Sequence, residues 1–136
     1  MPMTPVEEEV YQMLGGLTVR GTTKERTIAD SLALPKRSGG VEAVLRRLSM
    51  VSYIDIEMVT DIASRLGPST CARLGWVLER KREEWFVSEE ALEHLMGMIG
   101  RGPYRFGYVS RGSCFDSRWR LVLQETEETM ERWLDE

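Results

Sequence analysis

The sequence predicts a mainly helical α+β domain, in which several short helices pack with a small sheet. With 136 residues, of which 42% are hydrophobic, the chain suffices for one core but not for two. Apolar residues recur at helical spacing through most of the chain. β-Prone runs are short and lie near residues 17–20, 104–109 and 118–123. We expect a single domain over residues 1–136, made of an N-terminal helix (1–16), a core (17–123) and an acidic terminal helix (124–136).

The N-terminal helix is predicted from Thr4 to Leu14, because Pro5 suits a first helical turn and apolar residues follow at helical spacing. Gly15 and Gly16 end it. The β-prone residues 17–20 come next and predict a short strand.

A capping box predicts the start of a second helix. The Thr22 hydroxyl is placed to accept from the backbone amide of Glu25, while the Glu25 carboxylate reaches back to the cap. Arg26 and Asp30 are four residues apart and can pair on the exposed side. The residues expected to face the core are Ile28, Ala29 and Leu32.

The next pair of elements also permits a DNA-binding interpretation. After a break at Pro35 and Gly39-Gly40, the pattern of residues 41–48 predicts an amphipathic helix with Arg46 and Arg47 on its solvent-exposed face. Together with the preceding helix it resembles a helix-turn-helix unit, whose later helix would enter the major groove. The signal is weak, because two arginines at these positions more often belong to a solvated helix face.

Two central helices follow. Apolar residues from Ile54 to Ile62 lead into the first, and Pro68 begins the second, whose apolar stripe is Cys71, Leu74, Val77 and Leu78. Gly75 in its interior costs about 1 kcal/mol relative to alanine, so we expect another backbone to pack closely against it. Residues 80–84 are charged and predict a solvated helix end.

The C-terminal third combines a helix, two strands and a last helix. Ser88 can cap a helix from Glu89 to about Met98. The β-prone runs at 104–109 and 118–123 predict two strands joined by a loop around Gly112. The expected acidic helix runs from Glu125 to Leu134.

Charge is unevenly distributed in this third, although the net charge of the chain is only -4. Six acids and one arginine follow Arg120, after a segment with a single acid and five arginines: Arg101, Arg105, Arg111, Arg118 and Arg120. The two blocks can steer a partner or neutralise each other across a turn. If a surface binds nucleic acid or a partner, we expect it to be this arginine cluster. The aromatic residues beside it, which either stack on a single strand or fill the core, are Tyr104, Phe106 and Tyr108.

The sequence indicates a cytoplasmic location. Its two cysteines, Cys71 on a helix and Cys114 in a loop, have no pairing pattern and are expected to be reduced. The first residues are acidic rather than typical of a secretory signal, and no apolar run reaches the roughly 20 residues of a membrane span.

No pattern predicts catalysis, so we expect no catalytic residue, metal site or cofactor. His94 is the single histidine and lacks neighbouring ligands at metal-binding spacing. The glycine-rich segment 97–102 lacks the lysine of a phosphate-binding loop and ends a helix. Glu25 and Asp30 are explained by the helix cap and by Arg26.

Four separated blocks, in order, resemble the C-terminal domain of AbiEi-type antitoxins of type IV abortive-infection toxin-antitoxin systems. The blocks are residues 23–30, Pro35 with residues 39–42, residues 73–79, and residues 118–121. Their most characteristic residues are Glu25, Arg26, Asp30, Gly39, Gly40, Arg73, Gly75 and Trp119. Together they span most of the chain.

The resemblance implies a non-enzymatic antitoxin that counteracts a nucleotidyltransferase toxin without requiring a stable complex with it. The family usually has a winged-helix DNA-binding domain before the first block, and here only residues 1–22 precede it. The expected function is therefore an antitoxin-like or regulatory domain. The alternative is a small helix-turn-helix DNA-binding transcriptional regulator that reads DNA through Arg46 and Arg47.

Overall fold

The computed structural model describes residues 23–135. The predicted N-terminal helix, the predicted strand at 17–20 and the residue Thr22 lie outside the described residues. The described elements are α2 (Lys24–Ala33), the 3-10 helix η1 (Pro35–Ser38), α3 (Val41–Leu48), α4 (Ile56–Leu66), α5 (Pro68–Arg80), α6 (Glu89–Met98), β1 (Tyr104–Phe106), β2 (Cys114–Asp116), β3 (Leu121–Leu123) and α7 (Glu127–Asp135). The mainly helical α+β class is thus confirmed.

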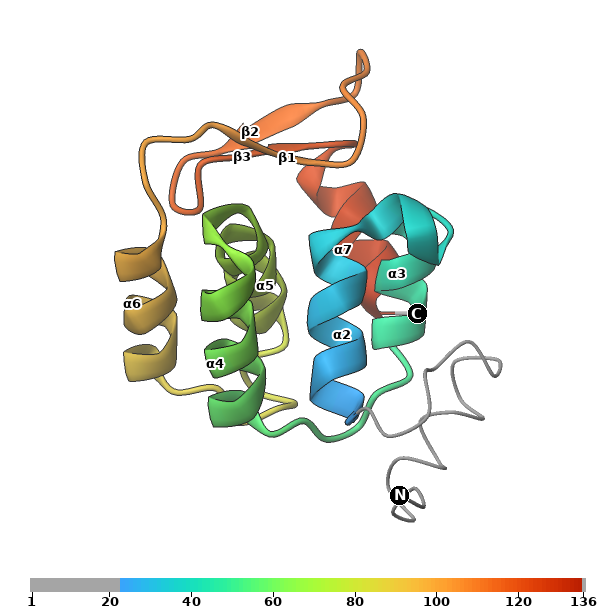
Figure 1. Ribbon diagram of the computed structural model, residues 1–136. Coiled ribbons are helices and arrows are strands. Elements are labelled where there is room, and N and C mark those ends of the chain that lie inside the picture. Colours follow the sequence, from blue (N-terminus) through green and yellow to red (C-terminus); the bar gives the residue numbers. More distant parts are fainter. Residues whose placement is uncertain (1–22, 136) are drawn as a thin grey trace.

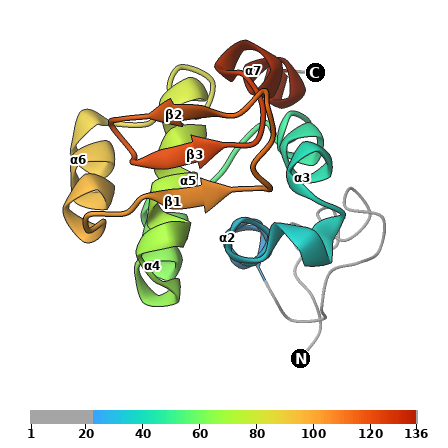
Figure 2. The ribbon, with the colours of Figure 1, turned by 90° about the horizontal axis from the view of Figure 1, so that it is seen from above.

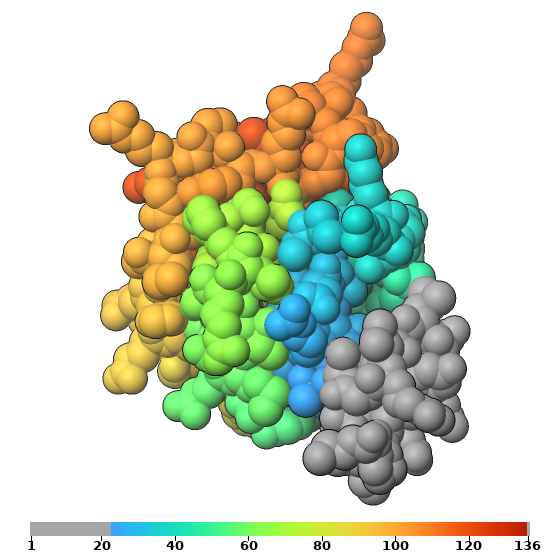
Figure 3. Space-filling model, viewed as in Figure 1, coloured from blue at the N-terminus to red at the C-terminus, as the bar shows by residue number. Residues whose placement is uncertain are grey.

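The small sheet lies across one end of the helices (Figure 1). Seen from above, the strands pass over the end of α5, with α6 at one side and α7 and α3 at the other (Figure 2). In the space-filling view, α2 and α4 pack side by side on the front face below the strand segment (Figure 3). None of the helices between residues 23 and 135 has the length and apolar character that a membrane crossing requires.

The sheet differs from the prediction in its strands and its pairing. β1 and β3 cover only three residues each, and residues 114–116, expected in the loop, form β2 and include Cys114. The strand order is β1-β3-β2, so β3 pairs with β1 in parallel and with β2 antiparallel. The parallel strands β1 and β3 cannot be joined by a tight hairpin. The long segment that connects them contains β2, which pairs on the other side of β3.

Side-chain caps fix where several helices begin. Asp55 accepts from the backbone N–H of Met58 at 3.0 Å, and Ser88 caps α6 as predicted. α7 begins two residues later than expected because the Thr126 hydroxyl accepts from the backbone N–H of Thr129. These local hydrogen bonds satisfy amides that have no partner within the helix.

The predicted capping box is wrong in its residues. The N-cap of α2 is Thr23, whose hydroxyl accepts from the backbone N–H of Arg26 at 3.1 Å. Glu25 is buried and accepts from the backbone N–H of Asp55 at 2.8 Å. It therefore ties the start of α2 to the start of α4 instead of returning to its own cap. The expected pair between Arg26 and Asp30 is present at 3.2 Å.

Gly75 is a close-packing position, as its helical location suggested, but its neighbour is a side chain and not another backbone. A Cβ built on Gly75 would lie 2.1 Å from a ring carbon of Trp119. The indole ring is completely buried, and its Nε1 donates to Glu79 on the same helix at 3.3 Å. This contact fixes the loop before β3 onto α5.

The expected solvated end of α5 is wrong for its first two residues. The Arg80 side chain is only 12% exposed, and its guanidinium lies 4.2 Å from the Trp76 ring. It pairs with Asp116 of β2 and with Glu127 and Glu131 of α7. Lys81 is buried against Trp85. Acids distant in the sequence therefore allow Arg80 to leave solvent, whereas Lys81 pairs with the nearby Glu84 at 2.6 Å.

Candidate functional site

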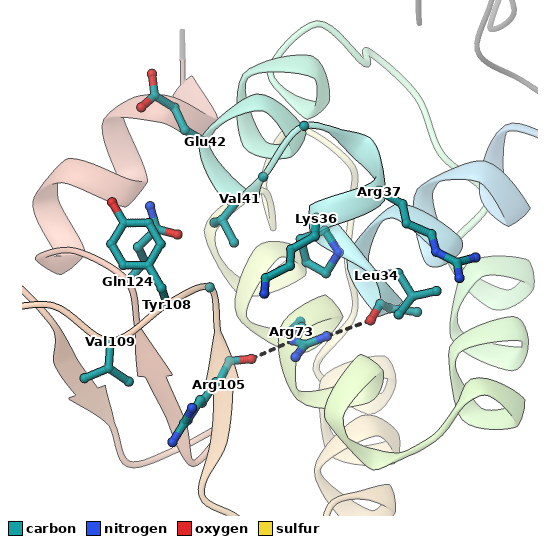
Figure 4. Close-up of a pocket in the computed structure, with 15 residues that line it drawn as sticks. Leu34, Lys36, Arg37, Val41, Glu42, Arg73, Arg105, Tyr108, Val109 and Gln124 are labelled. Atoms are coloured by element: carbon teal, nitrogen blue, oxygen red, sulfur yellow. Dashed lines mark hydrogen bonds between the residues drawn. The ribbon is translucent and has the colours of Figure 1, made fainter.

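A cleft of about 730 Å³ lies between the α2–α3 corner and the adjacent edge of the sheet (Figure 4). Its basic lining residues are Lys36, Arg37, Arg73 and Arg105. Its exposed apolar and aromatic lining residues are Leu34, Tyr108 and Val109. Glu42 is the acid in this lining, and Gln124 adds an uncharged amide.

The helical wall of the cleft is formed by η1 and the start of α3. Gly39 and Gly40 have φ angles of +94° and +98°, which other residues adopt only with strain, and they turn the chain sharply into α3. The Arg47 guanidinium donates to the Ser38 carbonyl at 2.5 Å and holds this turn. α3 then begins at Val41 without a side-chain cap.

The opposite wall follows β1. Gly107 has a φ of +96°, and a Cβ there would lie 2.2 Å from Oε1 of Gln124, so glycine lets the two chain segments approach. Tyr108 and Val109 come next and are 61% and 56% exposed. This wall of the cleft therefore includes the exposed side chain of Tyr108 and the nearly buried side chain of Gln124.

Arg73 connects the two walls from α5. Its Nη1 donates to the carbonyl groups of Leu32 and Ala33 at 2.9 and 3.0 Å, and its Nε donates to the Arg105 carbonyl at 2.8 Å. Figure 4 shows the hydrogen bonds from Arg73 to Ala33 and to Arg105. The first two acceptors are among the carbonyls that α2 leaves unpaired at its C-terminus. Burial lowers the pKa of Arg73 from its ordinary value.

The cleft favours an anionic ligand. Glu42 is engaged by Arg46, whose Nε lies 2.9 Å from its carboxylate, so its charge is partly neutralised. The four cations of the lining outnumber it, and the uncapped start of α3 adds backbone N–H groups with a positive partial charge. Such a surface attracts phosphates or carboxylates.

The predicted arginine cluster is not a single surface. Arg118 pairs with Glu79 of α5 and with Glu89 of α6, the latter at 3.0 Å. Arg120 donates to the carbonyl of Gly100. Arg101 and Arg111 are exposed in separate turns. Only one member of the cluster, Arg105, is in the lining of the cleft.

The aromatic residues near the cluster also separate. Phe106 is fully buried and meets the Trp76 ring edge to face at 5.9 Å. Tyr104 is half-buried, and its hydroxyl accepts from the backbone N–H of Gly100 at 2.7 Å. Tyr108 is the exposed member of the three and lies in the cleft. The core interpretation thus holds for Phe106, and a ligand can stack on Tyr108.

Lys36, Arg37 and Gln124 line the cleft but were not among the site residues predicted from the sequence. The first two stand in the Pro-Lys-Arg-Ser-Gly-Gly segment before α3, where adjacent cations and a glycine turn at a helix start are a recognisable anion-binding signal. Gln124 carried no such signal, because its position depends on the parallel pairing of β3 with β1.

The residues with possible catalytic chemistry do not gather at this cleft. His94 lies in a second hollow with Glu57, Asp61 and Glu90. Within residues 23–135, no group of three or more histidine, cysteine or acidic side chains is arranged to hold a metal ion.

Comparison with known proteins gives no match to a family model, to a curated protein or to a solved structure.

Proposed function

We propose that this chain acts in the cytoplasm as a non-enzymatic, antitoxin-like domain that counteracts a nucleotidyltransferase toxin. The proposal rests on the resemblance of four sequence blocks to AbiEi-type antitoxins. One observation supports it most: two of the four blocks, residues 73–79 and 118–121, are far apart in the sequence and contact each other through characteristic residues.

The block at residues 73–79 is the centre of these contacts. Arg73 binds the carbonyl groups of Leu32 and Ala33, which follow the block at residues 23–30 on α2. Gly75 packs against Trp119. Glu79 pairs with Arg118 and accepts from the Trp119 indole. A chance similarity in separate segments has no reason to select residues that meet in space, whereas a shared fold does.

Growth rescue tests the proposal. The full chain is co-expressed with a nucleotidyltransferase encoded beside its gene, and growth is expected to be restored relative to the empty vector. A matched control co-expresses a catalytically inactive toxin, which sets the growth expected without toxicity. Absence of rescue at equal, soluble expression of the full chain would contradict the antitoxin assignment.

A small helix-turn-helix DNA-binding regulator is the second candidate, because α2 and α3 are consecutive helices and Arg46 lies on the exposed side of α3. The geometry gives it less support. Arg46 pairs with Glu42, and Arg47 donates to the Ser38 carbonyl. The candidate predicts duplex binding that is sensitive to salt and falls in the Arg46→Ala/Arg47→Ala double variant. Unchanged affinity in that variant would exclude α3 as the reading helix.

A further inference from the structure

We propose that the cleft between η1 and β1 binds single-stranded nucleic acid, holding one base between Tyr108 and Gln124 and the adjoining phosphates on Lys36, Arg37 and Arg105. This inference goes beyond the proposed function and rests on the geometry of the cleft alone. The sequence predicts a binding surface formed by five arginines between Arg101 and Arg120, whereas the structure brings Lys36, Arg37 and Arg105 into one cleft with the exposed Tyr108.

The amide of Gln124 is the first observation that points to a ligand. Gln124 is only 7% exposed and lines the cleft. Its backbone N–H donates to Phe106 at 3.1 Å, and its carbonyl accepts from Ser110 and Ser113. Its side-chain amide has no hydrogen-bond partner among residues 23–135. A nearly buried amide with free donors and acceptors suits the edge of a base, which offers both kinds of group.

Tyr108 supplies the second observation. Its side chain is 61% exposed, and it lines the same cleft as Gln124; Figure 4 labels both residues among those of the lining. Tyrosine is a common stacking partner for unpaired bases, and stacking tolerates any base. The ring and the amide together provide a face contact and an edge contact for one base.

The cations explain why the ligand is a phosphate-bearing strand. Lys36 and Arg37 lie on the helical wall and Arg105 on the sheet wall, so phosphates on either side of the base meet positive charge. Arg73 is occupied by three backbone carbonyls and sets the distance between the walls. An acidic peptide would satisfy the cations, but its carboxylate side chains offer no flat ring that could stack on Tyr108.

The concave shape favours a single strand over a duplex. In a duplex the base edges and faces are paired and stacked, so a base cannot reach both Tyr108 and Gln124 without leaving the helix. A duplex can therefore contact the rim of the cleft through its phosphates only. We expect single-stranded RNA or DNA to bind more tightly than the duplex of the same sequence.

Fluorescence anisotropy with the full chain tests the proposal. The probe is a labelled mixed-sequence oligoribonucleotide of about ten nucleotides, within the range that single-strand-binding domains cover. Tyr108→Ala is expected to weaken binding about tenfold, and Tyr108→Phe to restore it because the ring is kept. Tyr53→Ala is the control, since Tyr53 is 64% exposed and lies outside the cleft lining.

Two further variants test the amide and the cations. Gln124→Glu keeps the shape but removes the donor and adds a negative charge, so affinity is expected to fall about tenfold. Lys36→Ala/Arg37→Ala is expected to lower the slope of log affinity against log salt by about 1.4, the value for two phosphate contacts on a single strand. Arg65→Ala is the control for charge, because Arg65 is an exposed cation of α4.

Three results would overturn the proposal. The first is no binding of the labelled strand at low salt. The second is binding that is equal for single strand and duplex and indifferent to Tyr108→Ala, which would indicate contact with charge alone. The third is displacement of the probe by polyglutamate as effectively as by unlabelled strand, which would indicate an acidic peptide as the ligand. Because the assay contains no toxin, its outcome is independent of growth rescue.

Discussion

Replacing Gly75 by alanine sets two effects of opposite sign against each other. In an isolated helix the change would be favourable, because alanine has the higher helix propensity by about 1 kcal/mol. In this fold the added Cβ would lie 2.1, 2.3 and 2.5 Å from three ring carbons of Trp119. The ring is rigid and fully buried, so the overlap cannot be relieved by rotating the flexible end of a side chain.

The cost is expected to exceed the gain. Overpacking in a core typically costs about 1–3 kcal/mol, and three simultaneous overlaps with a rigid ring place this case at the upper end. Subtracting the helix-propensity gain leaves a net loss of about 2 kcal/mol in the free energy of unfolding. At about 4 °C per kcal/mol for a chain of this size, Tm should fall by about 8 °C.

Chemical denaturation followed by tryptophan fluorescence measures this loss. Gly97→Ala is the matched control, because Gly97 also lies in a helix but a Cβ there has no atom within 4 Å. The control should be neutral or more stable than wild type. In a double-mutant cycle, Gly75→Ala should lower the free energy of unfolding less in the Trp119→Leu variant than in wild type. A Gly75→Ala variant as stable as the Gly97→Ala control would refute the argument that the indole closes this position.

Three further predictions concern Arg73, the two cysteines and Glu131. Arg73→Met should lower the free energy of unfolding by about 2 kcal/mol and accelerate hydrogen exchange at the end of α2. Arg73→Lys should not restore the stability, because one ammonium group cannot replace the several N–H donors of the guanidinium. A wild-type exchange rate in Arg73→Met would contradict this. Burial raises the pKa of Cys71, so a disulfide reagent should modify Cys114 in the folded chain and Cys71 only after unfolding, whereas rapid reaction of both thiols would show that the core opens locally. Burial raises the pKa of Glu131 above its ordinary value of 4.5, against the opposing effect of Arg80. The Glu131 carboxyl therefore binds its proton more tightly in the folded state than in the unfolded state. Its ionisation destabilises the fold: this loss of stability is absent below the pKa of the unfolded state and complete above the pKa of the folded state. Stability of Glu131→Gln relative to wild type should rise with pH through that window in pH-dependent denaturation, and a flat difference would contradict it.

Local signals predicted the helices well. Proline at the start of α5, Ser88 before α6 and apolar spacing in α2 act within one or two turns, so the sequence alone reveals them. Where a local signal had a distant competitor, the prediction was wrong. Glu25 matched a capping box, but its carboxylate accepts a hydrogen bond from the backbone amide of Asp55 instead.

The candidate site was less accessible from sequence. Arg105 and Tyr108 were among the residues singled out, yet Lys36, Arg37 and Gln124 join them only because the fold brings the α2–α3 corner to the sheet. Charge counting along the chain also failed to identify partners. The acids of α7 neutralise Arg80, which lies on a helix far earlier in the sequence, and not the arginines of the preceding segment.

The position of Arg73 has a consequence for the kinetics and entropy of binding. A guanidinium that links the backbone of both walls fixes the width of the cleft before any ligand arrives, so the backbone ordering that would oppose association is reduced in the free chain. Association should then occur in one step, with a rate governed by electrostatic attraction and therefore by ionic strength. Differences in affinity among ligands should appear mainly as differences in how slowly they leave.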